Sequence, residues 1–180
     1  MSHIFISGGC KNGKSTQAQR IAKRISQEQN LALYYVATMI PADAEDEERI
    51  QRHIAERAGW GFTTLEQAYN LTDLMNGADL NGVFLIDSLT ALLANHMFPA
   101  GRPPDLQAGE AVREQIRIFT QYAANIVFVS DYIYCDAAVY DSMTERYRRE
   151  LALTDAFTAG ICGTVIEVVH GGRILHKGAL

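Results

Sequence analysis

Eight residues near the start of the chain have the types and the spacing of a phosphate-binding loop. Residues 8–15 read Gly-Gly-Cys-Lys-Asn-Gly-Lys-Ser and fit the pattern G-x-x-x-x-G-K-[ST]. In such a loop the glycines let backbone N–H groups converge on a triphosphate, while the lysine neutralises phosphate charge and the hydroxyl ligates Mg²⁺. The alternative is a glycine-rich turn that matches the pattern by accident. We expect a nucleoside triphosphate to bind at Gly8, Gly9, Cys10, Lys11, Asn12, Gly13, Lys14 and Ser15, with Lys14 acting in catalysis and Ser15 on the metal ion.

The segments on either side of the loop have the order that such a site requires. Residues 3–7 form an apolar run that predicts a strand, and from Lys14 onward apolar residues recur at helical spacing. The helix N-terminus adds partial positive charge where the phosphates would lie. Strand, loop and helix in this order favour the phosphate loop over an accidental match.

A second candidate for the metal ion is Asp87. Residues 83–87 read Val-Phe-Leu-Ile-Asp and predict a buried strand that ends in a carboxylate, followed by a helix that Ser88 caps and that runs to Met97. In an open α/β sheet the ligand lies beyond the carboxyl ends of the strands, so an acid at this position reaches the Mg²⁺ of a bound nucleotide. The alternative is an aspartate that only caps the end of its strand.

The rest of the chain alternates between strand and helix patterns. This alternation predicts an α/β fold of the P-loop NTPase type, in which a mostly parallel sheet has helices on both faces and an antiparallel hairpin at its C-terminal edge. A chain of 180 residues is expected to form one domain, 1–180. The further strands are expected at 31–37, 60–64, 126–129, 164–169 and 173–176 with a turn at Gly171-Gly172, the further helices at 43–58, 66–75, 106–123 and 141–158, and loops at 99–105 and 132–140.

Composition narrows the partners and the compartment. The net charge of −5 argues against a nucleic-acid-binding surface, and three cysteines without C-x-x-C spacing indicate neither a disulfide framework nor a zinc site. No apolar run approaches the roughly 20 residues that span a bilayer, and the N-terminus begins a core strand without a signal-type leader. We therefore expect a cytoplasmic protein with no membrane span and no nucleic-acid partner.

Several separated motifs together resemble one family. They lie at residues 8–15, 35–38, 46–53 and 85–95, with Trp60, Thr64 and Glu66 between them, and they cover about the first 98 residues. The chain resembles the bifunctional adenosylcobinamide kinase / adenosylcobinamide-phosphate guanylyltransferase family, which helps assemble the nucleotide loop of cobalamin. The most discriminating parts are the acidic helix that ends in Arg-Ile-x-x-His and the Asp-x-Leu-Thr-x-x-x-x-Asn stretch.

The resemblance gives His53 the role of nucleophile. It implies that this histidine attacks the α-phosphate of GTP and holds GMP as a phosphoramidate, which suits an imidazole that is nucleophilic near neutral pH. Spacing alone would favour an exposed helix histidine without a catalytic role, among Arg49, Arg52 and Arg57. The polar helix at 43–58 is expected to lie across the surface or against a partner subunit, since few of its residues are apolar.

The resemblance also implies ligands and contacts. The cofactor would be Mg²⁺, the nucleotide substrates GTP and ATP, the acceptor the corrinoid adenosylcobinamide, and the assembly a homotrimer. The carboxylate of Glu66 has an alternative role as an acid in the first turn of a helix. The implied nucleotide contacts beyond the loop are Ala37, Thr38, Met39, Ile54, Ala55, Glu56, Arg57, Glu66 and Asp87.

The C-terminal half departs from the family pattern. After the strand at 126–129 the family has Ser/Thr-Asn-Glu-Val-Gly, whereas this chain has Ser130-Asp131-Tyr132, and the later Arg-x-Phe-Arg-Asp becomes Arg-Tyr-Arg-Arg at 146–149. This departure bears on the identity of the acceptor substrate more than on nucleotide binding. The main expectation is a kinase and guanylyltransferase, in which Arg146 or Arg148 could neutralise phosphate charge. The alternatives are a divergent small-molecule kinase without guanylyl transfer and a non-catalytic nucleotide-binding regulatory protein.

Overall fold

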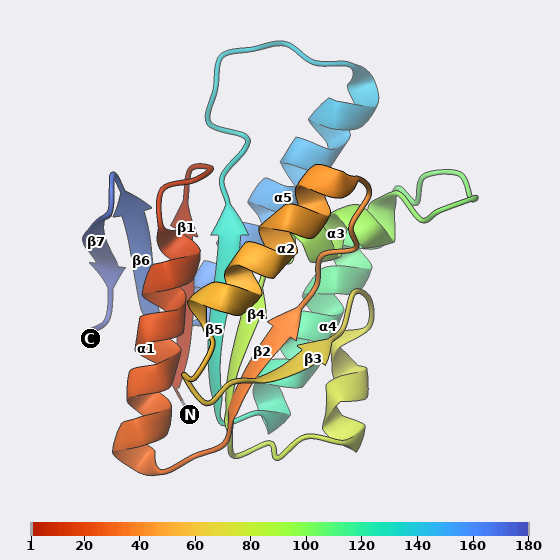
Figure 1. Ribbon diagram of the computed structural model, residues 1–180. Helices are drawn as coiled ribbons and strands as arrows, with labels where there is room; N and C mark the ends of the chain where they lie inside the picture. Colours follow the sequence, from red (N-terminus) through yellow and green to blue (C-terminus); the bar gives the residue numbers. More distant parts are fainter. Residues whose placement is uncertain (1, 180) are drawn as a thin grey trace.

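The computed structural model describes residues 2–179, except for the side chains of Ser2 and Arg49, and shows one sheet with helices on both faces (Figure 1). Within these residues the sheet has seven strands in the order β3-β2-β4-β5-β1-β6-β7. The strands are β1 (Ser2–Gly8), β2 (Leu33–Ala37), β3 (Thr63–Glu66), β4 (Val83–Asp87), β5 (Asn125–Asp131), β6 (Thr164–Val169) and β7 (Gly172–Lys177). The helices are α1 (Lys14–Gln29), α2 (Ala44–Glu56), the 3₁₀ helix η1 (Leu71–Asn76), α3 (Leu89–Met97), α4 (Ala108–Tyr122) and α5 (Ser142–Ile161).

The strand directions confirm the predicted fold class. Strands β1 to β6 pair in parallel, and β7 alone pairs antiparallel, with β6. The hairpin turn lies one residue earlier than predicted, at His170 and Gly171, which both have positive φ (49° and 79°), and Gly172 already belongs to β7. Because parallel strands all end at one edge of the sheet, the residues that follow β1, β2, β4 and β5 meet there.

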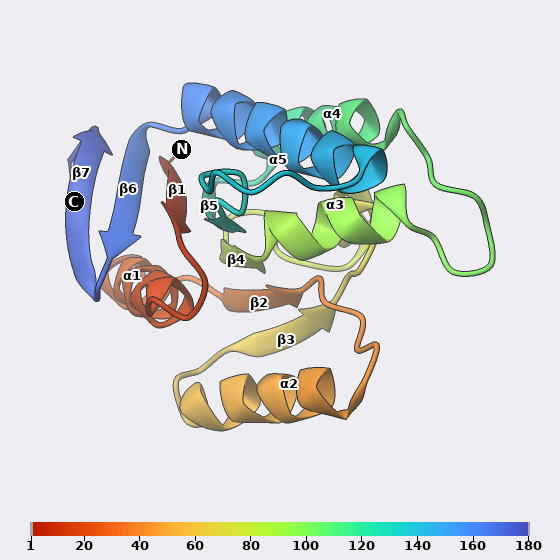
Figure 2. The same ribbon diagram turned by 90° about the horizontal axis from the view of Figure 1, so that it is seen from above.

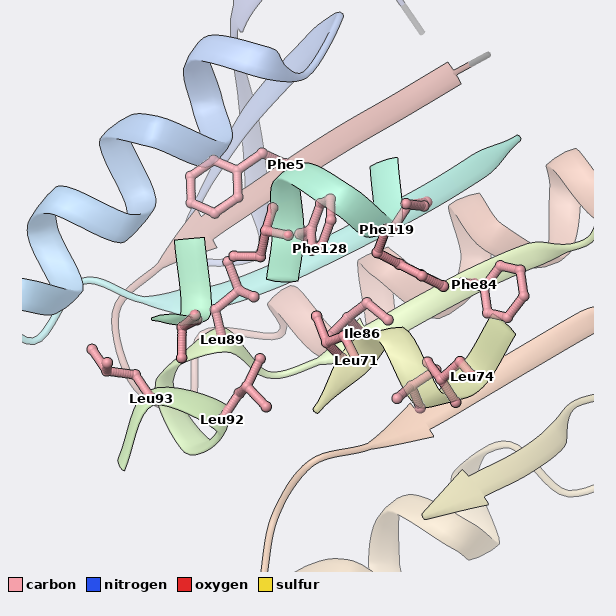
Figure 3. Close-up of a cluster of buried hydrophobic side chains, with 14 of the residues drawn as sticks. Phe5, Leu71, Leu74, Phe84, Ile86, Leu89, Leu92, Leu93, Phe119 and Phe128 are labelled. Atoms are coloured by element: carbon pink, nitrogen blue, oxygen red, sulfur yellow. The ribbon is translucent and has the colours of Figure 1, made fainter. Parts of the chain in front are cut away.

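The core lies on both faces of the sheet because side chains alternate along each strand. In β4, Phe84 and Ile86 point to the face covered by α3, α4 and α5, where Phe5, Phe119 and Phe128 join them (Figure 3). Val83 and Leu85 point to the other face and pack under α1. Burial on both sides explains why the strand sequences are continuous apolar runs.

Helix α2 stands apart from the other helices. Figure 2 shows it beyond the edge strand β3, on the opposite side of the sheet from α3, α4 and α5. Asp43 caps its N-terminus by accepting from the N–H of Asp46 at 2.9 Å, and most of its described side chains are exposed. The predicted polar surface helix at 43–58 is therefore confirmed.

The predicted helix at 66–75 is wrong. Glu66 is the last residue of β3, which spans 63–66 instead of the expected 60–64, and the helical segment η1 begins only at Leu71. Asn70 determines this start, because its side-chain oxygen accepts from the N–H of Thr72 (3.3 Å) and from its hydroxyl (2.7 Å). Glu66 consequently has no role as an acid in a first helical turn.

Within residues 2–179 no helix combines the length and the apolar character needed to cross a bilayer.

Candidate active site

The loop between β1 and α1 has the predicted strand–loop–helix geometry. Gly13 caps α1 with φ 88°, a left-handed conformation that glycine adopts without strain. The Asn12 side chain closes the loop against β6, since its amide donates to the carbonyl of Val168 and its oxygen accepts from the N–H of Lys14 at 3.2 Å. A Cβ on Gly8 would lie 2.7 Å from the Val168 carbonyl oxygen, so this position requires glycine.

Lys14 lies inside the loop with only 6% of its surface exposed. Its ammonium group donates to the carbonyl of Gly9 at 3.1 Å and forms an ion pair with the carboxylate of Asp131. Asp131 is the last residue of β5 and lies beside Gly8 in the parallel register, and its N–H donates to the hydroxyl of Thr90 at 2.9 Å. The sequence analysis places Asp131 at the end of a strand but assigns it no role. It could have been identified as a candidate site residue by the criterion used for Asp87, a carboxylate at the end of a buried strand.

Asp87 meets two hydroxyl groups at the carboxyl end of β4. Ser15 donates to its Oδ1 at 3.4 Å and Tyr35 donates to its Oδ2 at 2.9 Å. The structure thus brings together the two predicted metal ligands, Ser15 and Asp87. Among the described residues no group of three or more His, Cys, Asp or Glu side chains could hold a metal ion by itself. One carboxylate with one hydroxyl suits Mg²⁺ that arrives with nucleotide phosphates, because Mg²⁺ takes few protein ligands and keeps phosphate and water oxygens.

The ends of three neighbouring strands are aligned beside this pair. Ala37 of β2 is in register with Asp87 on one side and with Glu66 of β3 on the other. The implied contacts Ala37, Glu66 and Asp87 therefore form one row at the same edge of the sheet. Glu66 is exposed and Ala37 is half-buried, so a ligand can reach this row from outside.

Thr38, the next implied contact, is fixed by side-chain hydrogen bonds. Its hydroxyl accepts from the N–H of Ser88 at 2.7 Å and donates to the Ser88 carbonyl at 2.8 Å. The Asn95 amide donates to the carbonyls of Thr38 at 2.7 Å and Ala68 at 2.8 Å. Asn95 thus joins the segments that follow β2 and β3. This explains physically why the stretch Asp-x-Leu-Thr-x-x-x-x-Asn ends in an asparagine. Met39 follows, half-buried.

Arg57 connects the end of α2 to the Ser15–Asp87 pair through Tyr35. The guanidinium is buried and lies 3.9 Å above the centre of the Tyr35 ring, and its Nη2 donates to the hydroxyl of Thr64 at 3.2 Å. The hydroxyl of the same tyrosine binds Asp87. Of the nucleotide contacts that the resemblance implies at residues 54–57, Arg57 is therefore the one whose side chain contacts strands β2 and β3.

His53 contacts a residue of its own helix. Its Nδ1 is 3.3 Å from a carboxylate oxygen of Glu56, and 27% of its side chain is exposed. Among the described side chains, no hydrogen bond or ion pair joins α2 to residues 8–15. Ile54, Ala55 and Glu56 are exposed. The structure thus groups the loop, Asp87, the strand-end row and Arg57, and leaves these four residues of α2 apart.

A second buried carboxylate lies behind Asp131. Asp155 of α5 is 3% exposed and accepts from the hydroxyl of Tyr134 at 2.8 Å. Burial raises the pKa of the Asp155 carboxyl to about 7, and the nearby charge of Asp131 acts in the same direction. Burial also raises the pKa of Tyr134. Both carboxylates lie in the C-terminal half of the chain, at the end of β5 and on α5.

The arginines suggested for phosphate binding have local partners. Arg148 is buried, forms ion pairs with Asp136 (2.7 Å) and Glu145 (2.8 Å), and lies over the ring of Tyr140. Arg146 lies 3.4 Å from Glu150. Arg148 thus holds the segment before α5, whereas Arg146 donates to the carbonyl of Leu106, before α4, at 2.9 Å.

Comparison with known proteins identifies the family. The model of the cobinamide kinase / cobinamide phosphate guanyltransferase family (CobU) matches residues 4–175. This chain belongs to that family. It is also 30% identical over 177 residues to the bifunctional adenosylcobalamin biosynthesis protein CobP of Pseudomonas aeruginosa, covering 97% of this chain and 96% of that protein. The predicted resemblance and the predicted enzyme class, a kinase and guanylyltransferase of cobalamin biosynthesis, are confirmed.

Solved structures show the same fold at low sequence identity. The flagellar accessory protein FlaH of Methanocaldococcus jannaschii matches with a TM-score of 0.50 and 15% identity, covering 98% of this chain and 78% of that one. A KaiC-like protein of Pyrococcus horikoshii OT3 matches with a TM-score of 0.54 and 10% identity, covering 98% and 79%. An ATPase domain matches with a TM-score of 0.57 and 10% identity, covering 98% and 77%. These likenesses confirm the P-loop NTPase-type fold.

Proposed function

We propose that the chain phosphorylates adenosylcobinamide with a nucleoside triphosphate and then transfers GMP from GTP to the phosphate it has made. One observation carries the proposal: in a member of this family, buried Lys14 and the Ser15–Asp87 pair meet at the strand edge where a triphosphate would bind. The proposed nucleotide contacts are the loop 8–15, Ala37, Thr38, Met39, Ile54, Ala55, Glu56, Arg57, Glu66 and Asp87.

The first step is transfer of the γ-phosphoryl group. The oxygen of the acceptor hydroxyl forms a bond to the γ-phosphorus and its proton passes to water. The bond from the γ-phosphorus to the β-γ bridging oxygen breaks, and a nucleoside diphosphate leaves. Such a transfer depends on positioning and on neutralisation of phosphate charge, which the amides of the loop and Lys14 supply. Ser15 and Asp87 would hold Mg²⁺, which neutralises charge on the β- and γ-oxygens when bound.

The second step is guanylyl transfer through His53. An imidazole nitrogen forms a bond to the α-phosphorus of GTP and pyrophosphate leaves; a phosphate oxygen of the acceptor then displaces the histidine. Because no hydrogen bond or ion pair joins the described side chains of α2 to the loop, this step requires α2 to approach the loop or a second copy of the chain to supply the helix. The proposed homotrimer would place the exposed polar face of α2 against such a copy.

The proposal also covers the domain organisation of the chain and its compartment in the cell. The chain 1–180 forms one domain, since residues of β1, β2, β4, β5 and α2 all contribute to the site. The proposed compartment is the cytoplasm, where nucleoside triphosphates are available.

A second candidate is a kinase of the same fold without guanylyl transfer. The observation that favours it is that, among the described side chains, no hydrogen bond or ion pair joins α2 to the phosphate loop. In that case the imidazole of His53 serves only structural contacts such as that with Glu56, and its replacement leaves all nucleotide chemistry unchanged.

One labelling experiment separates the two candidates. The purified protein is incubated with Mg²⁺ and GTP labelled at the α-phosphate, denatured, and tested for label that is acid-labile and alkali-stable. We expect such label on the wild type and on His176→Asn, an exposed histidine of β7, but not on His53→Asn. Absence of label from wild type that demonstrably binds GTP would exclude the guanylyl-histidine and leave the kinase.

A further inference from the structure

A cleft lies on the side of the phosphate loop away from Glu66 and α2. It has a volume of about 370 Å³ and lies between the loop, the segment after β5, and the end of β6. Loop residues 9–12 form one wall, Tyr132 a second, and residues 168–170 a third. The implied contacts outside the loop, from Ala37 to Asp87, take no part in it. Its volume is at the lower end of the roughly 300–1,000 Å³ usual for small-molecule sites.

Tyr132 gives the cleft an aromatic wall and Val168 and Val169 an apolar one, and hydrogen bonds hold these walls in place. The Tyr132 ring approaches within 3.8 Å of where a Cβ on Gly9 would lie, and the Tyr132 N–H donates to the carbonyl of Gly8 at 3.3 Å. On the opposite wall, Val168 is buried and its carbonyl accepts from the amide of Asn12. An aromatic ring beside an apolar strand end provides a surface on which a planar base can stack.

The entrance of the cleft has exposed polar side chains. Lys11 and His170 are exposed, and both have positive φ (54° and 49°), which fixes the turns that carry them. The carboxylate of Glu167 lies 2.9 Å from His176 and is also a hydrogen-bond partner of the Tyr132 hydroxyl. A ligand with an apolar planar part and anionic phosphates would therefore place the planar part against Tyr132 and its charge toward the loop.

We propose that this cleft binds the nucleobase of the phosphoryl donor, so that one phosphate loop serves two base positions. The inference rests on the proposed two-step function. The α-phosphate lies between the base and the β-phosphate, so the side on which the base lies decides which groups face the α-phosphate. A base on the β2–β3 side directs the α-phosphate of GTP toward α2 and His53. A base in the cleft beside β6 turns the α-phosphate of the donor away from His53 and leaves the γ-phosphoryl group for the acceptor.

The first test compares ATP with a ligand that has no base. Dissociation constants of Mg²⁺-ATP and Mg²⁺-tripolyphosphate are measured by calorimetry on the full chain. For Tyr132→Leu we expect about a tenfold weaker affinity for ATP, the size of one aromatic–base stack, and unchanged affinity for tripolyphosphate. The matched control is Tyr122→Leu, an exposed tyrosine at the end of α4, which should change neither constant. An equal loss of affinity for both ligands in Tyr132→Leu, or no change in either affinity, would overturn the proposal.

A second variant tests the cleft without changing Tyr132. Val169→Trp places an indole at the end of β6, where residue 169 lines the cleft. It should also lower the affinity for ATP but leave the affinity for tripolyphosphate unchanged. Photo-crosslinking with 8-azido-ATP should modify residues 132 or 168–170, and modification at 63–69 instead would contradict the assignment.

Labelling of His53 by GTP is measured on the same variants. It should continue in Tyr132→Leu and Val169→Trp, because the guanine of GTP would bind on the other side of the loop; parallel loss of labelling and ATP binding would refute two base positions. Failure of the proposed guanylyl transfer would appear separately, as absence of His53 labelling in the wild type while the ATP and tripolyphosphate results stand.

Discussion

Lys14 and Asp131 form an ion pair at the point where β1 and β5 end side by side. The lysine that the phosphate loop offers to a ligand is thus already bound by a carboxylate of the protein, and both side chains are buried. A bound phosphate competes with Asp131 for this ammonium group and is repelled by the same carboxylate. Asp131 therefore lowers the affinity of the loop for its ligand.

The first prediction concerns Asp131→Asn, which removes the negative charge and keeps the size of the side chain. Affinity for Mg²⁺-ATP should rise about three- to tenfold, the range of a modest coupling between charges. Without ligand the variant should unfold at lower temperature, because Lys14 then lies buried without its ion pair, and saturating Mg²⁺-tripolyphosphate should restore most of this loss. Calorimetry and thermal unfolding measure both effects.

The control is Asp136→Asn, which breaks an ion pair with Arg148 outside the loop and should leave nucleotide affinity unchanged. Weaker nucleotide binding by Asp131→Asn would show that the carboxylate assists the ligand and would refute this account.

The phosphate loop and Asp87 could be predicted because local sequence decides their positions. A glycine pattern between a strand and a helix, and an acid at the end of a buried strand, leave little freedom once the sheet is parallel. Asp131 follows the same rule, but the strand order that places β5 between β4 and β1 comes from the fold. The predicted helix at 66–75 failed because Glu66 pairs with Ala37 in the sheet and Asn70 starts a later, shorter helix.

The second prediction concerns Tyr35→Phe. The phenylalanine keeps the ring under Arg57 but loses the hydroxyl that donates to Asp87 at 2.9 Å. Groups that orient a metal ligand typically contribute about 10- to 100-fold to metal affinity. We expect the Mg²⁺ concentration for half-maximal phosphoryl transfer to rise about tenfold, with little change in stability.

Tyr34→Phe is the matched control, because the neighbouring tyrosine of β2 accepts from the N–H of Asp79 away from the site. A change in Mg²⁺ dependence of the same size in both variants would show that the effect does not come from Asp87.

The third prediction concerns the buried carboxyl of Asp155. Its pKa is about 7 in the folded protein and ordinary, near 4, in the unfolded chain, so the folded state keeps the proton as the pH rises between these values. Asp155 therefore lowers the free energy of unfolding progressively from about pH 4 to pH 7, by up to about 4 kcal/mol. Asp155→Asn removes this loss, so its stability relative to the wild type should rise over that interval and level off above it. Urea unfolding at pH 4, 5.5, 7 and 8 measures the difference; a difference independent of pH would contradict the raised pKa.

The position of α2 marks the limit of what sequence could predict about the site. The acidic start and the Asp43 cap determine that 44–56 is a helix, and its polar surface predicts exposure. The place of α2 beyond the edge strand β3 depends on how the chain passes around that strand, which no local pattern encodes. Arg57 differs from its neighbours because its guanidinium has an aromatic ring and a hydroxyl as partners, and these come from β2 and β3.

The fourth prediction concerns Asn95, whose amide holds the segments after β2 and β3 together. In Asn95→Ala the carbonyls of Thr38 and Ala68 lose their donor, which should lower the free energy of unfolding by about 1–3 kcal/mol. The same change should weaken GTP binding more than tripolyphosphate binding, because the segments it loosens lie beside the loop and carry the proposed base contacts. Asn81→Ala, which removes a hydrogen bond to Asp79 in an exposed turn, should do neither. Loss of stability with unchanged discrimination between the two ligands would show that Asn95 supports the fold alone and does not position the nucleotide.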